Sequence, residues 1–536
     1  MQEDKTMKKY LIIVLTLVVA CMAAGCSKLL DIPQQNVVDL DTYYANASDA
    51  EADALIAHIY REAYLAHDVN YLNYLNSMSD DGMSFNSFDQ TAQNHVMNYY
   101  FPIYYNINYL SNLIIEKLPS NSDEKKRIIG EAYFWRAWAF LNLTRGWGTP
   151  PLVDHILAAD ELKPSNGDPQ ALWNYVETSL EEAQKLLPEK SGLGAQAVIG
   201  GRISKGAAIA LQGKARVLRG DYEGAATLLG GLVSGGKYRL IDNFGDLYHH
   251  NADFCDEYMW EYNAADNAGQ ETYRNEGDTR VQGLTWNSSD VRTPGGFETG
   301  SGSLCDIDRN LYDFFVARGE QGKARYKATL WNYEETLDRF VELGEATSRT
   351  DAISKLWVGG TVKNQGYFRA KMVPTWDDLY DYPYSEARFV RLKSNWPGMR
   401  YAEVLLLYAE ACVQSHSNLA EGKAALDQVR GRAGLPASSK FDLQAVKDEK
   451  RAELVFEGER FFDLIRWGEA ESLLAHRGTK EYIFRGYRNG TTSYNVSVTD
   501  RPNSAGFQAR EKLLPFPASE TSYNKNLTQN TGWNNQ

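Results

Sequence analysis

Apolar residues recur at helical spacing over long stretches at both ends of the chain. The densest case lies between Asp123 and Gly146, where two adjoining stripes are formed by Ile128, Ala132, Trp135, Ala139 and Leu143, and by Phe134, Trp138 and Leu141. A helix that is apolar on two faces must be covered on both, so its aromatic rings are predicted to be core rather than a platform for a ligand. Glycines and prolines between Gly146 and Pro151 end the predicted helix.

Further helices are predicted by capping signals and by the same spacing. Residues 48–51 form a capping-box pattern, and Asp168 followed by Pro169 marks another helix start. In residues 205–233, small and large apolar residues alternate on two segments separated by a turn at Gly220, which resembles a tetratricopeptide-type helix pair. Helical spacing returns in residues 400–413, 419–430 and 442–457. Because such pairs bury their faces by stacking, these segments predict a helical scaffold.

The middle of the chain has no sustained helical period. It is rich in Gly, Asn, Asp, Tyr and Trp, which indicates a loop-rich lobe with a few short strands. The predicted fold is therefore mainly α, with tetratricopeptide-like helix pairs forming a scaffold beside an irregular lobe. The expected divisions are a signal peptide at 1–25, an N-terminal helical region at 26–236, the loop-rich lobe at 237–398 and a C-terminal helical region at 399–536.

The N-terminus carries an export signal. Lys8 and Lys9 precede an apolar run at residues 11–24, which is too short for a comfortable membrane span and is typical of a signal peptide. The run closes on Ala-Ala-Gly-Cys26, which resembles a bacterial lipobox whose cysteine is lipidated and becomes the mature N-terminus; the alternative is an ordinary signal with a chance cysteine. If Cys26 carries lipid, Cys255, Cys305 and Cys412 remain, so at most one disulfide can form.

Charge and motifs exclude several classes of function. The chain has 56 basic and 70 acidic residues, a balance that disfavours nucleic acid as a partner. Metal and nucleotide motifs of the HExxH, CxxC and GxxxxGK[ST] types are missing, so no metal or cofactor is expected. His249 and His250 are interpreted as surface residues, because no further metal-ligand type lies close to them in the sequence.

A glycosidase would need two opposed carboxylates. Asp80-Asp81 and Asp377-Asp378 qualify by residue type, but adjacent residues in an extended chain point to opposite faces. A structural or ligand-binding role is the preferred interpretation. Three glutamates recur every fourth residue at Glu449, Glu453 and Glu457, with Arg451, Arg460 and Arg466 nearby, and we interpret this pattern as an ion-pair network of the scaffold.

Several segments, in order, resemble the outer-membrane nutrient-binding lipoproteins of the SusD/RagB family. They are CSKLLDIPQQN after the lipobox, GEAYFWRAWAFLNLTRGWGTPPL, KGAAIALQGKARVLRGDY, RYAEVLLLYAEA, VRGRAGLP, KRAELVFEGERFFDLIRW, and LLPFPASE with LTQNTGW. Two departures are Thr531, where a proline is usual, and a leader without an acidic run after Cys26. The resemblance implies a non-catalytic lipoprotein on the cell surface, anchored to the outer membrane, that captures a glycan and delivers it to a SusC-like TonB-dependent transporter.

Two zones have the composition of a sugar site, because pyranose rings stack on aromatic faces and their hydroxyls need polar partners. The first zone is residues 79–95, and the second is the middle lobe; in the family, ligand residues come from the same two zones. The candidates are Asp81, Phe85, Asn86, Phe88, Trp286, Asn287, Phe297, Trp331, Trp376 and Tyr380. Two other functions stay open: a RagB-like peptide binder, and a helical-repeat interaction scaffold without a small ligand.

Overall fold

The computed structural model describes residues 39–67, 69–82, 88–198, 200–263, 307–342, 344, 346–355, 365–372, 378, 394–487 and 493–533. The chain divides into two compact units, Met1–Ser48 and Asp49–Gln536. In the first unit, helix α2 (Leu40–Asn46) begins at Asp39, whose carboxylate accepts a hydrogen bond from the Thr42 amide. The predicted signal peptide and Cys26 lie outside the described residues.

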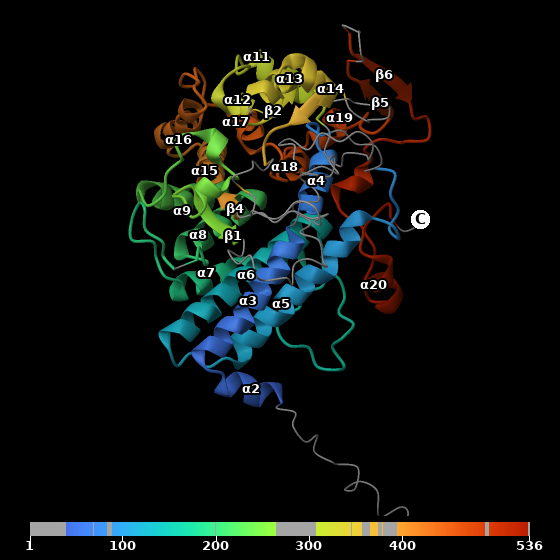
Figure 1. Ribbon diagram of the computed structural model, residues 1–536. Coiled ribbons are helices and arrows are strands. Elements are labelled where there is room, and N and C mark those ends of the chain that lie inside the picture. The colour runs from blue at the N-terminus through green and yellow to red at the C-terminus, as the bar shows by residue number, and fades with distance from the viewer. Residues whose placement is uncertain are drawn as a thin grey trace, which may run out of the picture. The chain divides into compact units, whose positions relative to one another are not determined.

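The second unit opens with long helices that pack side by side (Figure 1). They are α3 (Asp49–Ala66), α4 (Val69–Ser77), the short η1 (Val96–Tyr99), α5 (Tyr100–Lys117), α6 (Asp123–Trp147) and α7 (Pro169–Leu186). The predicted start signals are confirmed: the Asp168 side chain accepts from the Ala171 amide, and Pro169 is the first helical residue of α7. Ser122 caps α6 in the same way, by accepting from the Lys125 amide.

The succession of neighbouring helices continues through the chain. Helix α7 packs on α8 (Lys205–Leu218), α8 on α9 (Tyr222–Ser234), and α9 on α15 (Tyr401–Ser415), which contacts α16 (Leu419–Arg432) and α17 (Leu443–Leu454). Gly220, with a φ of 83°, forms the predicted turn between α8 and α9. Gly213 lets these two helices approach closely, because a Cβ there would lie 2.2 Å from the Leu229 side chain. Each pair is therefore completed by the next, as the sequence predicted.

The aromatic helix α6 lies in the core. Trp135 is 0% exposed and Trp138 is 5% exposed. The Trp135 ring meets Tyr60 edge-on at 5.0 Å and lies beside Tyr262 at 6.1 Å between centroids. This confirms the prediction that both stripes of the helix are covered.

The C-terminal segment, with η6 (Ala509–Lys512) and α20 (Ala518–Tyr523), fastens the end of α6. Trp147 donates from its indole to the Pro515 carbonyl at 2.8 Å. Asn530 donates to the carbonyls of Trp147 and Leu514 at 3.0 and 2.7 Å. Two motifs far apart in the sequence thus meet at one place, because the C-terminal segment supplies partners for the polar groups at the exit of the helix.

The middle region combines short helices and short strands. It contains η2 (Phe244–Asp246), η3 (His250–Ala252), β1 (Tyr258–Tyr262), α11 (Arg309–Ala317), α12 (Ala324–Lys327), β2 (Leu330–Asn332), α13 (Tyr333–Glu342), α14 (Arg349–Lys355), β3 (Tyr367–Arg369) and β4 (Trp396–Arg400). Antiparallel pairs form between β1 and β4 and between β2 and β3. The mainly helical fold with a few short two-stranded sheets is confirmed, although the sequence analysis missed α11 and α13.

The C-terminal region also contains a hairpin that the sequence analysis did not predict. After α18 (Arg460–Arg466) and α19 (Ala470–Leu473), β5 (Lys480–Arg485) pairs antiparallel with β6 (Asn495–Asp500). Figure 1 shows this hairpin beside the short helices of the middle region. Phe484 of the hairpin joins a buried cluster with Tyr333, Leu337, Phe340 and Phe368, so the hairpin is fixed to the middle lobe by apolar packing.

Buried ion pairs hold α17 against the middle lobe. Arg325 is 0% exposed and contacts the carboxylates of Glu320, Glu449 and Glu453. Arg400 joins the same network through Glu453 and Glu457. The predicted network of glutamates therefore exists, but its cations differ from those expected. The helix turns its glutamates inward, and the paired bases come from other segments.

The arginines expected in that network serve elsewhere. Arg460 forms two hydrogen bonds to Asp80, at 2.8 and 2.9 Å. Arg451 donates to Asp81 at 2.7 Å. Arg466 binds Glu410 and Asp463. Within the described residues, no helix is long and apolar enough to cross a membrane.

Candidate functional site

An open groove of about 1040 Å³ lies between the middle lobe and the β5–β6 hairpin. We name it the tyrosine groove, because Tyr312, Tyr367, Tyr482 and Tyr494 all line it. The other lining residues are Asp308, Arg309, Asn310, Asn332, Glu334, Gln365, Gly366, Leu473, His476, Arg477, Gly478, Thr479, Lys480, Val496 and Val498. Aromatic faces therefore alternate here with amides and other polar groups.

Short strands and α11 position the aromatic wall. Asn332 and Tyr367 are register partners in the β2–β3 pair, and both side chains line the groove, as expected for opposite residues of an antiparallel pair. Tyr312 comes from the first turns of α11, and its ring centroid lies 4.9 Å from that of Tyr367, with 34° between the planes. The two rings thus form a continuous aromatic surface.

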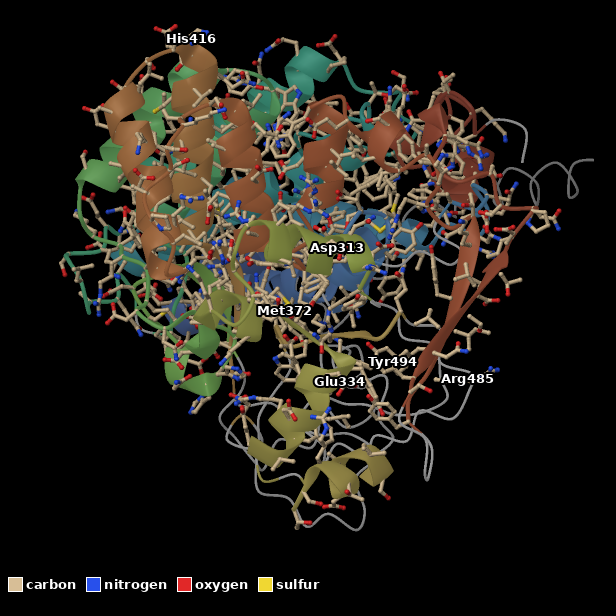
Figure 2. The ribbon with its side chains drawn as sticks, turned by 90° about the horizontal axis from the view of Figure 1, so that it is seen from above. Asp313, Glu334, Met372, His416, Arg485 and Tyr494 are labelled. Carbon is tan, nitrogen blue, oxygen red and sulfur yellow. The ribbon has the colours of Figure 1, made fainter. Side chains whose placement is uncertain are left out.

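The opposite wall comes from the hairpin and α19 and exposes large apolar side chains. Leu473 is 46% exposed, Tyr494 44% and Val498 53%. Tyr494 and Glu334 of α13, both labelled in Figure 2, line the same groove, and the Tyr494 ring lies 5.4 Å from that of Tyr333 at the start of α13. Exposed apolar side chains that gather around one concavity are typical of a binding surface.

The charged groups of the groove are largely bound to protein partners. Asp308 accepts from Arg477 at 2.6 Å and from Gln365 at 3.3 Å. Glu334 is held by Arg349 and by the Tyr487 hydroxyl. These two carboxylates are thus engaged by the protein, and the phenols and amides of the groove stand beside the side chains of Arg309 and Lys480, which also line it.

Tyr367 and Tyr482 stay protonated at physiological pH. Burial raises the pKa of Tyr367 to about 12, and it raises the pKa of Tyr482 as well. Protonated phenols both donate and accept hydrogen bonds, and sugar hydroxyls require both kinds of partner.

The two zones predicted for ligand binding meet at the edge of this groove. Gly82 and Ile307 form an isolated antiparallel bridge, and the Asp308 amide donates to the Asp81 carbonyl at 2.9 Å. Asp308 also lines the groove. The start of the first zone therefore lies next to residues 307 and 308 of the second.

Two predicted ligand residues of the first zone are buried. Asp81 is 1% exposed and its carboxylate is bound by Arg451, while Arg460 and Arg451 lower the pKa of neighbouring Asp80 to about 2, against the opposing effect of burial. Phe88 is 2% exposed and meets Phe507 edge-on at 5.5 Å. The expectation of a surface ring at Phe88 is corrected, because apolar packing around Phe507 covers it.

Of the other predicted ligand residues, only Trp331 is described. Its side chain is half-buried and lines a different cavity from the tyrosine groove. Phe85, Asn86, Trp286, Asn287, Phe297, Trp376 and Tyr380 lie outside the described residues, as does Cys26. Their assignment stays a prediction.

The sequence analysis missed the tyrosines of the groove. The clearest signal was the alternation of Tyr482 and Phe484, and of Val496 and Val498, which is typical of a strand with one covered face. His249 was also misjudged: its Nδ1 lies 2.7 Å from the Asp378 carboxylate, and its side chain is only 22% exposed. Among the described residues, no group of three or more metal-ligating side chains is assembled.

Comparison with known proteins shows the family to which the chain belongs. Residues 259–533 match the model of the SusD family, and residues 31–216 match a family described as starch-binding and associating with the outer membrane. The chain belongs to the SusD family. Proteins of the SusD family are non-catalytic binding proteins.

The relatives align over most of their length. SusD-like protein P38 of Formosa agariphila is 22% identical, over 88% of this chain and 93% of the relative. A laminarin-binding SusD-like protein of known structure has a TM-score of 0.69 at 25% identity and covers 91% of this chain and 100% of its own. Surface glycan-binding protein A of Bacteroides thetaiotaomicron, solved with laminarihexaose, has a TM-score of 0.67 at 20% identity, over 90% and 100% of the two chains.

Proposed function

We propose that this SusD-family protein is a glycan-binding lipoprotein that holds an oligosaccharide or polysaccharide in the tyrosine groove. The observation that carries the proposal is the arrangement of four tyrosines around one open groove, interleaved with Asn310, Asn332 and Gln365. Pyranose rings present apolar faces to such rings and hydroxyls to such amides. The laminarin-binding relative supports a glycan as the cargo.

Affinity in this groove is expected to be moderate. An aromatic contact contributes on the order of 1 kcal/mol beyond its buried area, and immobilising the ligand and side chains opposes binding. Several rings must therefore act together, and micromolar binding follows. Moderate affinity suits a protein that passes its cargo on.

We further propose that the protein is anchored to the outer membrane by lipid on Cys26 and delivers glycan to a SusC-like TonB-dependent transporter. The lipobox-like sequence before Cys26 and the match to an outer-membrane-associating family support this. Cys26→Ala is expected to release the protein from the outer membrane, because acyl chains supply the anchoring free energy. Unchanged partition into outer-membrane lipid would place the anchor elsewhere.

Calorimetry with laminarihexaose, maltohexaose, xylohexaose, mannohexaose and a mixed peptide library tests the binding function. Binding of at least one oligosaccharide, lost severalfold in Tyr312→Ala, is expected. Tyr523→Ala is a matched control, since Tyr523 is 63% exposed and lines neither the tyrosine groove nor the cavity beside Trp331. Binding of peptides alone would support a RagB-like function, and no binding of either class would favour an interaction scaffold.

A further inference from the structure

A second cavity, of about 740 Å³, lies on the other side of the β2–α13 segment from the tyrosine groove. Phe244, Tyr248 and Met372 form part of its apolar lining. Among the residues that the structure describes, the two concavities share none in their linings. The cavity is therefore a separate place at which a ligand can bind.

Strand β2 distributes its side chains between the two concavities. Asn332 lines the groove, and the preceding residue, Trp331, lines the second cavity, as the alternation of a strand requires. Helix α13 continues the division: Glu334 belongs to the groove, whereas Glu335 and Asp338 belong to the cavity. Because neighbouring residues line the two concavities, their edges are separated by about the thickness of one strand.

Trp331 is held as a fixed surface of this cavity. Its indole Nε1 donates to the Lys327 carbonyl at 2.6 Å, so its one polar atom is satisfied by the protein. The side chain remains half-buried, with the ring on the cavity wall. A fixed, partly exposed indole without a polar requirement of its own is suited to stacking against an apolar face.

In the described part of the chain, five acidic and three basic residues line the cavity, and most of their charged groups are bound by protein partners. Asp378, which is 1% exposed, binds His249 Nδ1 and the His250 amide, each at 2.7 Å. That contact leaves Nε2 as the remaining hydrogen-bonding atom of His249. Lys371 donates to the Glu453 and Val455 carbonyls, so its charge is engaged behind the cavity wall.

Charged groups on the exposed face of α13 are paired as well. Arg339 pairs with Glu342 at 3.0 Å, and Asp338 pairs with Arg349. Acids and bases that neutralise each other give little attraction for a charged ligand, but their remaining lone pairs and N–H groups can bind hydroxyls. This chemistry fits a neutral polyol with one apolar face.

We propose that this cavity is a second carbohydrate site, which takes a hexopyranose unit of a neutral glycan stacked on Trp331 and hydrogen-bonded by His249 and the α13 side chains. The inference rests on the proposed glycan-binding function and adds a second point of attachment. A polysaccharide that occupies both concavities binds with higher overall affinity, because its second segment is held at a high effective concentration once the first is bound. Short oligosaccharides occupy the two concavities independently.

The test uses calorimetry and surface plasmon resonance on the full protein with laminarihexaose, maltohexaose, xylohexaose and mannohexaose and their parent polysaccharides. Wild-type protein should bind two molecules of the recognised hexasaccharide. Trp331→Ala and Tyr494→Ala should each weaken a different one of the two binding events severalfold, and each should lower the affinity for the polysaccharide by a similar factor. Trp331→Phe, which keeps an aromatic face, should weaken the second site less than Trp331→Ala does. Tyr523→Ala should behave as wild type, and melting temperatures of all variants are compared.

The outcomes separate the two proposals. One molecule bound per protein, with Trp331→Ala unchanged in stoichiometry and affinity, would overturn the second site and leave the groove intact. Two molecules bound, both lost in Trp331→Ala without loss of thermal stability, would show one extended site and overturn the inference of independent sites. Absence of binding to every glycan would overturn the proposed function, and the second site with it.

Discussion

Helix α6 and the tyrosine groove are both rich in aromatic rings, yet they stand in opposite environments. In α6, Trp135 and Trp138 are at most 5% exposed and meet further aromatic rings on each side. In the groove, Tyr494 also meets aromatic rings, but it is 44% exposed and lines an open groove together with amides. Ring content therefore does not distinguish scaffold from site. Exposure does: rings covered on every side stabilise the fold, and rings with an open face beside hydrogen-bonding groups are suited to a ligand.

Truncation of the scaffold ring should have the largest effect. Trp135→Ala removes a fully buried side chain and is expected to lower the free energy of unfolding by about 3–5 kcal/mol. Urea unfolding measures this loss. Trp331→Ala is the matched control, because its half-buried ring should lower stability far less. A Trp135→Ala protein with full stability and weakened glycan binding would reverse the contrast between α6 and the groove.

The scaffold was predictable from the sequence because its signals are local and repeated. The two stripes of α6, the Asp168-Pro169 start of α7 and the turn at Gly220 all depend on residues within one or two helical turns. The short helices α11 and α13 were missed, since nine or ten residues give too few repeats of the helical period. Buried partners such as Arg325 were also missed, because Glu449 lies 124 residues away along the chain.

The groove was harder to predict because it is assembled from four separated segments. Tyr312, Tyr367, Tyr482 and Tyr494 come together only through the β2–β3 pair and the packing of the hairpin on the middle lobe. Composition selected the two zones as candidates but could not predict the exposure of each ring. Phe88 shows this most clearly, since its polar sequence neighbours predicted a surface ring, and a contact with Phe507, 419 residues later, covers it.

Phe88 therefore tests where the scaffold ends and the site begins. Phe88→Ala is expected to cost about 3 kcal/mol of stability, because it removes a ring that is 2% exposed. The remaining folded protein should bind glycan with unchanged affinity. Thermal denaturation and calorimetry on the same sample report the two quantities. If Phe88→Ala weakened glycan binding and left the stability at the wild-type value, Phe88 would instead be part of the ligand-binding surface.

The contrast extends to polar groups. In the scaffold, the buried carboxylate of Glu261 on β1 accepts hydrogen bonds from the Phe254 backbone amide at 2.9 Å and from the Asn395 side-chain amide at 3.0 Å. The tyrosine groove, in contrast, contains neutral amide side chains. Burial raises the pKa of Glu261 to about 7, from 4.5 in the unfolded chain. The folded protein thus binds the carboxyl proton of Glu261 more tightly than the unfolded chain does. The contribution of this protonated carboxyl to the stability of the fold is complete below pH 4.5 and is lost as pH rises through 7.

Glu261→Gln should remove this pH dependence. At pH 8 the variant is expected to be more stable than wild type by about 2 kcal/mol, because no charge must be buried. The Asn395 amide can turn to accept from the new side chain. Unfolding free energies at pH 5, 6, 7 and 8 measure the effect. If the unfolding free energy of the wild type changed with pH in the same way as that of Glu261→Gln, the Glu261 carboxylate would be ionised or solvated throughout.

The smallest effect on folding is expected in the groove itself. Tyr494→Ala removes a ring that is 44% exposed and touches Tyr333, Phe484 and Tyr487 only along its edges and at tilted angles. Its loss should lower glycan affinity severalfold, on the order of 1 kcal/mol, while the melting temperature barely changes. Tyr494→Phe keeps the stacking face and removes the hydroxyl, so it divides the loss between stacking and hydrogen bonding. If Tyr494→Ala destabilised the protein as much as Trp135→Ala, the Tyr494 ring would belong to the core cluster around Phe484. The groove would then not be a surface for binding a ligand.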